Sequence, residues 1–226
     1  MRTHKCKGCS FKSDAAKNLN DTEFEILENN SVQVNFKKGE IIIKQNALSL
    51  NVAYLRTGIV KLHLQGPTRE KILRIVKAPA YIGIPTTFGD KINQFSVTAI
   101  EPATVCFIDS TLFTNFIYTN GKFAYEIIAE LCRNELNDYQ RSASQAQKQI
   151  TGLVAETLLC LSDKIYESDN FNFPITRSEM GDLIGSSRES VSRVLTEFGN
   201  EKIIEINSNE IKILKKDLLK QISDKG

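Results

Sequence analysis

The stretch ITRSEMGDLIGSSRESVSRVLTEF, residues 175–198, decides the fold of the last third of the chain. It contains two capping boxes, a T-x-x-E box that starts at Thr176 and an S-x-x-E box that starts at Ser186. Two helix starts ten residues apart leave room for only one short helix and a tight turn between them. Gly185 suits that turn, because glycine adopts positive φ without steric cost. The spacing therefore predicts a helix-turn-helix.

Each of the two expected helices has one apolar face. In the second helix, Glu189, Arg193 and Thr196 fall opposite the apolar stripe when residues are placed at about 100° intervals. Arg188 lies in the first turn of the same helix. The expected apolar stripes are Met180, Leu183 and Ile184 in the first helix and Val191, Val194, Leu195 and Phe198 in the second.

The side chains opposite the second stripe suit the reading of duplex DNA. Arginine grips guanine O6 and N7 through two donors, and glutamate accepts from cytosine N4. A purely structural interpretation competes, in which Glu189 is a capping-box partner and forms an i, i+4 surface pair with Arg193. The two capping boxes, the glycine turn and a following hairpin occur together, which favours the DNA interpretation.

The flanking residues complete a small helical domain. A helix is expected over Val154–Tyr166, ahead of the helix-turn-helix, and a hairpin is expected behind it. The hairpin closes through Asn207, Ser208 and Asn209, which are turn-forming residues. Its facing strands carry Ile203, Ile204 and Ile206 on one side and Ile211 and Ile213 on the other.

The first half of the chain has a different periodicity. From Val32 to Ile108 it consists of short alternating runs punctuated by glycine, such as the run between Gly58 and Gly66. A period of two with closely spaced turns predicts an antiparallel sandwich or roll. His63 lies on the polar side of its run and is expected to face solvent, which argues against haem.

One long helix is expected between these two parts. Phe123, Ile127, Ile128 and Leu131 recur at helical spacing, and a helix over 122–149 would be ~42 Å long. A helix of that length suits pairing with a second copy of itself, which predicts a homodimer. The alternative is a connector with one face on the roll. Cys132 and Cys160 lie among apolar helix residues and are expected in the core.

Composition excludes some classes of protein and supports others weakly. The 226 residues are 41% hydrophobic and 25% charged, as in globular proteins. No apolar run is long enough to span a bilayer, and the polar first residues, MRTHKCKGCSFKSDAAKN, lack the apolar region of a signal peptide, so a cytoplasmic protein is expected. Residues 151–226 hold ten Lys and Arg against thirteen Asp and Glu, a net charge of −3. DNA binding must therefore depend on a few well-placed cations.

The quoted stretch resembles the helix-turn-helix of the Crp/Fnr family of regulators, whose pattern is I-T-R-x-E-I-G followed by G-x-S-R-E-[TS]-V-x-R-x-L. Met180 is a mild departure. Upstream, the segments FKKGEII at 36–42, AYLRTGIVKL at 53–62 and AYIG ending at Gly83 resemble the β-roll of the family. The resemblance implies that Arg188, Glu189 and Arg193 read bases. It implies that the remaining interface residues hold phosphates or support the helix, namely Thr176, Arg177, Ser187 and Ser190.

The resemblance also implies an architecture and partners. We expect an α+β protein in which an antiparallel, jelly-roll-like β-roll is followed by a dimerisation helix and a winged helix-turn-helix. The expected segments are a flexible tail over 1–20, a sensor roll over 21–120, the dimerisation helix over 121–149 and the DNA-binding domain over 150–226. The expected partners are a second copy, double-stranded DNA with a two-fold symmetric operator, and RNA polymerase.

The sensor positions depart from the family members that bind cyclic AMP. Those members carry a glycine–glutamate pair and, about ten residues later, an arginine–serine pair that grip the ribose and the cyclic phosphate. Here the first pair is Gly83 and Ile84, and the second pair aligns with Gln94 and Phe95. A phosphate that leaves water needs a charged or multi-donor partner. The sequence therefore predicts that cyclic AMP is not bound in the usual mode and leaves the effector unknown.

The cysteines suggest a second sensor hypothesis. Cys6 and Cys9 form a C-x-x-C pair, and Cys106 aligns with an internal cysteine that the iron–sulfur members of the family use as a ligand. Asp14 or His4 would have to complete the site, although four thiolates are the ordinary requirement. The simpler interpretation makes Cys106 a buried strand residue. A cluster, and with it a redox-, nitric oxide- or oxygen-responsive regulator, is therefore an alternative that the sequence does not favour.

Two further functions compete with a transcription regulator. A ligand-binding module without DNA activity would explain the roll but not the segment GSSRESVSR. A redox enzyme would use the cysteines, but the sequence has no nucleotide fingerprint, Ser-His-Asp grouping or carboxylate pair that supports catalysis. We therefore expect a DNA-binding regulator without enzymatic activity.

Overall fold

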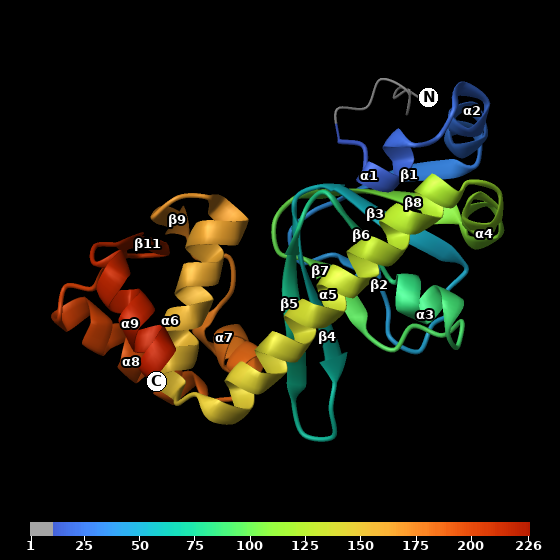
Figure 1. Ribbon diagram of the computed structural model, residues 1–226. Helices are drawn as coiled ribbons and strands as arrows, with labels where there is room; N and C mark the ends of the chain where they lie inside the picture. The colour runs from blue at the N-terminus through green and yellow to red at the C-terminus, as the bar shows by residue number, and fades with distance from the viewer. Residues whose placement is uncertain (1–10) are drawn as a thin grey trace. The chain divides into compact units, whose positions relative to one another are not determined.

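The computed structural model describes residues 11–226, which group into two compact units (Figure 1). The first unit contains the residues up to Leu64 together with Arg74–Leu136. The second contains Gln65–Leu73 together with Asn137–Gly226. The chain thus passes between the units after residues 64, 73 and 136.

Two four-stranded sheets form the roll, in the orders β1-β8-β3-β6 and β2-β7-β4-β5. In β3 and β4, Leu55 and Val60 are fully buried, as are Val97 in β7 and Val105 in β8. Each such side chain stabilises the fold by ~1.5–3 kcal/mol through burial. The expected antiparallel roll is confirmed. Its strands are β1 (Ser31–Phe36), β2 (Ile41–Ile43), β3 (Asn51–Thr57), β4 (Ile59–Gln65), β5 (Glu70–Lys77), β6 (Ala80–Ile82), β7 (Ser96–Ala99) and β8 (Ala103–Asp109).

The N-terminal residues require a correction to the expected tail. Residues 11–20 contain a helical turn, α1 (Asp14–Lys17), and a second helix follows, α2 (Asp21–Asn29). Ala15 and Leu19 are buried in the core of the first unit together with Ala16, because these small and apolar side chains pack in one cluster with aromatic residues of the roll. The expectation of a flexible tail is therefore wrong for residues 11–20, while residues 1–10 lie outside the described part of the chain.

Helix α5 (Gly121–Gln147) is the expected long helix and follows α3 (Ile84–Phe88) and α4 (Ser110–Thr119). Phe123 and Ile127 pack into the core of the first unit. The opposite face carries exposed apolar side chains, which we call the α5 seam. Cys132 lies on this face rather than in the core, because it follows the exposed Ile128 by one helical turn. The seam consists of Tyr125, Ile128, Cys132, Leu136 and Tyr139.

The second unit contains the helix-turn-helix and a three-stranded sheet of order β10-β11-β9 (Figure 1). The expected hairpin is confirmed, with Ile204 opposite Ile213 and Ile206 opposite Ile211. Cys160 is exposed, contrary to expectation, because it is the last residue of α6 before a π-helical turn. The elements are α6 (Ile150–Cys160), η2 (Leu161–Tyr166), β9 (Asn170–Asn172), α7 (Arg177–Ile184), α8 (Arg188–Asn200), β10 (Ile204–Asn207), β11 (Glu210–Ile213) and α9 (Lys216–Lys225).

No helix among residues 11–226 combines the length and the apolar character that a membrane crossing requires.

Candidate nucleic-acid interface

The first helix of the interface, α7, begins with the predicted capping box. The Thr176 hydroxyl accepts a hydrogen bond from the Glu179 amide at 3.1 Å, and the Glu179 carboxylate accepts one from the Thr176 amide at 2.7 Å. These bonds satisfy two amides that a helix start otherwise leaves without partners. Arg177 is exposed in the first turn. The capping box therefore fixes the backbone from which this cation projects.

The turn between the helices is tight and depends on two glycines. Gly185 has φ +77°, the left-handed conformation expected for a glycine that ends a helix. The Ser186 amide donates to the Gly181 carbonyl at 2.9 Å. A Cβ on Gly181 would lie 2.8 Å from the Ser186 carbonyl oxygen, closer than such contacts occur in proteins. Gly181 therefore allows the close approach of the turn to α7.

The recognition helix, α8, begins one residue later than predicted. The capping residue is Ser187, whose hydroxyl accepts from the Ser190 amide at 3.1 Å. The predicted capping box at Ser186 is wrong, because the Ser186 amide is engaged in closing α7. Glu189 then lies in the first turn, where its own backbone amide, and secondly the Ser187 hydroxyl, hold the pKa of its carboxyl below the usual value. An ionised, exposed carboxylate at this place accepts hydrogen bonds.

Helix α8 separates its buried and exposed faces completely. The predicted inner stripe, Val191, Val194, Leu195 and Phe198, is at most 2% exposed, whereas Arg188, Glu189 and Arg193 are exposed. In α7 the predicted stripe, Met180, Leu183 and Ile184, is buried as well, so the predicted apolar faces of both helices are confirmed.

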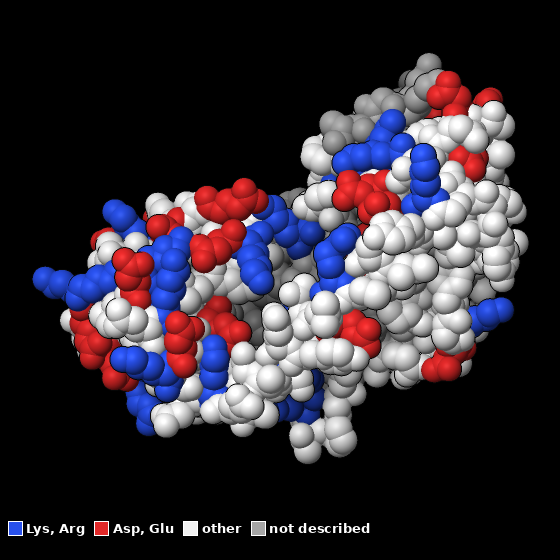
Figure 2. Space-filling model, in the orientation of Figure 1, with Lys and Arg blue, Asp and Glu red and all other residues white. Residues whose placement is uncertain are grey.

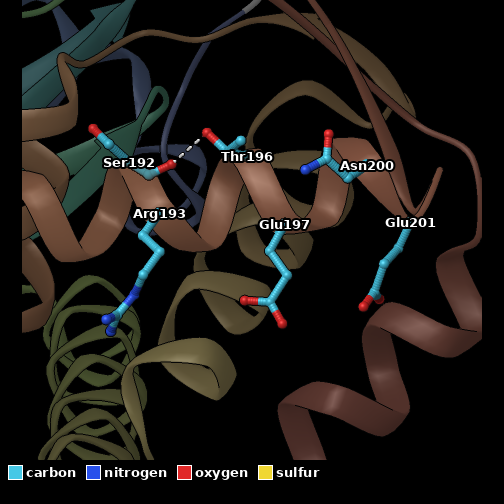
Figure 3. A pocket seen from close by; sticks show the side chains of 6 residues that line it. All are labelled: Ser192, Arg193, Thr196, Glu197, Asn200 and Glu201. Carbon is cyan, nitrogen blue, oxygen red and sulfur yellow. Dashed lines mark hydrogen bonds between the residues drawn. The ribbon is translucent and has the colours of Figure 1, made fainter.

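Six residues line a surface hollow along the outer face of α8 (Figure 3). In the figure, Ser192, Thr196 and Asn200 project along one side of the helix, and the Thr196 hydroxyl donates to the Ser192 carbonyl at 2.9 Å. Arg193, Glu197 and Glu201 project along another side. Sequence reasoning passed over Ser192, Glu197 and Asn200, although Ser192 and Asn200 each lie four residues from Thr196 and Glu197 lies four residues from Arg193, which marks the same face.

Charge changes sign along this helix. Its first half carries Arg188, Glu189 and Arg193, two cations and one anion for a net charge of +1, whereas Glu197 in its second half and the capping residue Glu201 are acidic. Over the second unit, the visible face shows basic and acidic side chains interspersed rather than one basic patch (Figure 2). Attraction to a polyanion along α8 therefore comes from the two arginines of its first half.

The sensor positions of the first unit show a contrasting arrangement. Gly83 has φ +81° and precedes α3, where the hydroxyls of Thr86 and Thr87 donate back to the Gly83 carbonyl. Ile84 is 5% exposed. The expected pocket residues therefore include none that is charged. Gln94 is exposed and donates to the Asp90 carboxylate at 3.2 Å, and Phe95 is half-buried.

The expected metal ligands are only partly described. Cys6 and Cys9 lie outside the described residues. Cys106 is half-buried in β8, opposite Gln33 in β1 and Tyr54 in β3. Within residues 11–226, no three or more His, Cys, Asp or Glu side chains are grouped to hold a metal ion.

His63 also departs from expectation. It is half-buried, with Nε2 2.8 Å from the Thr98 hydroxyl, because Thr98 of the neighbouring strand β7 projects on the same face of the sheet.

Comparisons with known proteins agree with this arrangement. Residues 154–222 match the Crp-like helix-turn-helix domain, and residues 33–120 match the cyclic nucleotide-binding domain. The transcriptional activator protein FnrA of Stutzerimonas stutzeri is 22% identical over 220 residues, which cover 95% of this chain and 90% of the relative. The cAMP-activated global transcriptional regulator CRP of Pasteurella multocida is 26% identical over 147 residues, 63% of this chain and 70% of the relative.

Solved structures share the fold. FixK2 from Bradyrhizobium japonicum has a TM-score of 0.77 at 16% identity, covering 85% of this chain and 96% of that structure. A regulator of the Crp/Fnr family from Eubacterium rectale has a TM-score of 0.76 at 16% identity, covering 92% and 96%. At such identities the structures support the fold alone. Together with the two domain matches and the regulators similar in sequence, the helix-turn-helix places this chain in the Crp/Fnr family of DNA-binding transcription regulators.

Proposed function

We propose that the protein acts in the cytoplasm as a homodimer that inserts α8 into the major groove of a two-fold symmetric operator. The observation that carries this proposal is the division of α8 into a buried apolar face and an exposed polar face with cations in its first half. A helix of this kind reads base edges from its N-terminal end in helix-turn-helix proteins.

The residues of the interface divide into two roles. Arg188 and Arg193 offer paired donors to guanine, and Glu189 offers an ionised acceptor to cytosine N4. The other group holds phosphates, which fix the register of the protein on the duplex without reading sequence. This group consists of Thr176, Arg177, Ser187 and Ser190.

The α5 seam supplies the dimer contact in this proposal. Ile128 and Leu136 are 58% and 60% exposed, and they follow Tyr125 at helical spacing. Pairing two seams removes these apolar side chains from water. A two-fold dimer presents two copies of α8, so the half-site centres should lie ~34 Å apart, one turn of the duplex.

We further propose that the effector is not a cyclic nucleotide held in the usual mode, although one relative is named as cAMP-activated. Ile84 and Phe95 offer no donor for a phosphate, and Gln94 is engaged with Asp90. An iron–sulfur cluster is not favoured either, because the sequence offers three candidate thiols, Cys6, Cys9 and Cys106, whereas a cluster ordinarily takes four thiolates. RNA polymerase is the proposed protein partner.

Two substitutions test the reading face. Arg193→Ala should weaken binding to a selected operator by ~1–3 kcal/mol and relax specificity at one base pair per half-site, because a bidentate guanine contact is lost. Arg177→Ala should weaken operator and random DNA equally and reduce the salt slope by ~1. If Arg193→Ala weakened both DNAs by the same factor, the residue would be a phosphate contact and the proposed reading face would be wrong.

A further inference from the structure

The tip of the β4–β5 hairpin belongs to the same compact unit as the helix-turn-helix. Within this unit the Arg69 guanidinium donates from Nη1 to the Ser186 carbonyl at 3.1 Å. The Lys71 ammonium donates to the Leu183 carbonyl at 2.8 Å. Both acceptors are backbone groups at the end of α7 and in the turn that leads into α8. The hairpin tip therefore touches the turn of the motif through two cations.

Lys71 has the environment of an anchor. It is half-buried, and its Nζ also lies 3.4 Å from the Gln145 side-chain oxygen. Gln145 in turn donates to the same Leu183 carbonyl at 2.9 Å. Burial, and then the neighbouring charges of Arg69 and Arg141, lower the pKa of Lys71. The hairpin is thus joined to α7 by a partly desolvated contact, next to two further cations.

Arg69 has a different environment. Its side chain is exposed, and its hydrogen-bond partner Ser186 directly precedes Ser187, the capping residue of α8. Guanidinium carries five donors in a planar fork that matches phosphate geometry, so one bond to a carbonyl does not exhaust it. Residues 151–226 have a net charge of −3 and hold few cations that can attract a phosphate backbone. A further cation beside the start of α8 would therefore add to that attraction.

We propose that Arg69 is a phosphate-binding residue of the DNA interface, contributed from outside the helix-turn-helix, and that Lys71 positions it. The proposal rests on the proposed function, and it adds to that function a binding residue from the roll sequence. The ligand is the DNA backbone rather than a base, because Arg69 lies beside the turn and not on the exposed face of α8.

Charge and hydrogen bonding at Arg69 can be separated by three variants, measured as DNA affinity against salt concentration. Arg69→Ala should weaken operator and random DNA by the same factor and reduce the salt slope by ~0.9, the value for one lost phosphate contact. Arg69→Gln should do the same, since it can keep a bond to Ser186 but has no charge. Arg69→Lys should retain the slope. Lys225→Ala, which removes an exposed cation from α9, is the charge-matched control and should leave the slope unchanged.

The positioning role of Lys71 calls for a double-mutant cycle. Lys71→Ala should weaken DNA binding when Arg69 is present and have little further effect in the Arg69→Ala background. Losses that simply add would show that Lys71 does not act through Arg69. If Arg69→Gln kept the salt slope of the parent, Arg69 would act only through its hydrogen bond to the turn and would not bind a phosphate.

The failure of this inference is distinguishable from failure of the proposed function. If Arg69→Ala binds like the parent while Arg193→Ala is weakened, the inference is wrong and the proposed function stands. If neither changes, the proposed reading face is wrong as well. If Arg69→Ala binds DNA more tightly than the parent, the hairpin opposes DNA binding and the inference is overturned.

Discussion

The starts of two helices, α8 in the second unit and α3 in the first, differ in how they are capped and in where their polar side chains turn. Helix α3 is capped by Gly83 in the left-handed conformation, whereas α8 is capped by Ser187 in an extended conformation, two residues after the left-handed Gly185. At α8 the side chains that follow are long, charged and exposed. At α3 the hydroxyls of Thr86 and Thr87 turn back to the Gly83 carbonyl. One helix start is arranged for an outside partner, and the other is satisfied by its own chain.

The difference between the two helix starts indicates which one is available to an external ligand. A polar group that leaves water is costly unless it is hydrogen-bonded, so buried polar groups find partners within the chain. The hydroxyls of Thr86 and Thr87 have such a partner in the Gly83 carbonyl. Ile84, the residue after Gly83, is buried and apolar. Exposed side chains such as Arg188 and Arg193 remain in contact with water when no DNA is bound, so they need no partner within the chain. Four predictions test this distinction.

The largest effect is expected at the α5 seam, which is exposed in one copy of the chain and is proposed to contact a second copy. Ile128→Asp places one carboxylate from each copy in the seam, and like charges at a contact cost several kcal/mol. The dimer dissociation constant should rise at least ~100-fold, about 2.7 kcal/mol. Sedimentation velocity over a concentration series measures it.

The matched control for the seam is Lys122→Asp, which makes a larger charge change at an exposed residue outside the seam. It should leave the dissociation constant within about threefold of the parent, a difference of roughly 0.65 kcal/mol. A parent protein that sediments as a monomer at micromolar concentration, yet binds a single half-site tightly, would disprove the dimer.

The next effect concerns the backbone contact that orients α8. Gly181→Val should lower the free energy of unfolding of the second unit by about 2 kcal/mol, because its Cβ would meet the Ser186 carbonyl oxygen at 2.8 Å. DNA affinity should fall with it. Thermal unfolding and a gel-shift assay read the two effects.

Gly199→Ala provides the contrast, since a Cβ there meets no atom within 4 Å. It should raise the free energy of unfolding by about 0.5–1 kcal/mol, because alanine loses less entropy than glycine in a helix. Equal destabilisation by the two substitutions would contradict the close packing at Gly181.

A smaller effect tests whether the residues after position 10 belong to the sensor core. The Ser13 hydroxyl lies 2.8 Å from the buried Tyr81 hydroxyl. Ser13→Ala should cost about 1–2 kcal/mol, because it leaves the Tyr81 hydroxyl buried without this partner. Adding Tyr81→Phe should recover part of the loss, since both polar groups are then absent. If Ser13→Ala unfolds at the parent temperature, the N-terminal packing is not maintained in solution.

The last expected effect is zero. Cyclic AMP or cyclic GMP at millimolar concentration should not change the melting temperature, because α3 and the Gln94–Phe95 pair offer the phosphate no charged partner. A ligand at one hundred times its dissociation constant would add ~2.7 kcal/mol of stability. An upward shift of several degrees would show that the first unit has kept a nucleotide site by other contacts.

Local sequence signals predicted the helix-turn-helix well, because its determinants are close together in the chain. The capping box of α7 is formed by Thr176 and Glu179, which are three residues apart. The buried residues of α8 recur at helical spacing. The capping box at Ser186 failed for a reason that is only partly local. Both Ser186 and Ser187 can cap a helix, and the choice depends on which amide closes α7 onto Gly181.

Contacts between distant residues lay beyond the sequence reasoning. Arg69 and Ser186 are 117 residues apart, and no periodicity relates them. The burial of Ala15 and Leu19 depends on the faces of α4 and α5 that receive them. Cys132 was placed in the core because its neighbours are apolar, but those apolar residues divide between a buried face and the seam. The number of apolar residues in a helix does not reveal which of its apolar faces is covered by the rest of the chain and which is exposed.

The passage of the chain between its two units after residues 64, 73 and 136 has a consequence for inheritance and for protein engineering. A module that is contiguous in space but interrupted in sequence cannot be transferred by a single crossover. A chimera joined at residue 136 would pair one regulator's helix-turn-helix with another regulator's hairpin tip, and Leu183 and Ser186 would meet whatever side chains that hairpin carries at positions 69 and 71. Recombination between relatives would therefore be tolerated only where hairpin and turn are exchanged together, so the two segments should change in concert as the family diverges.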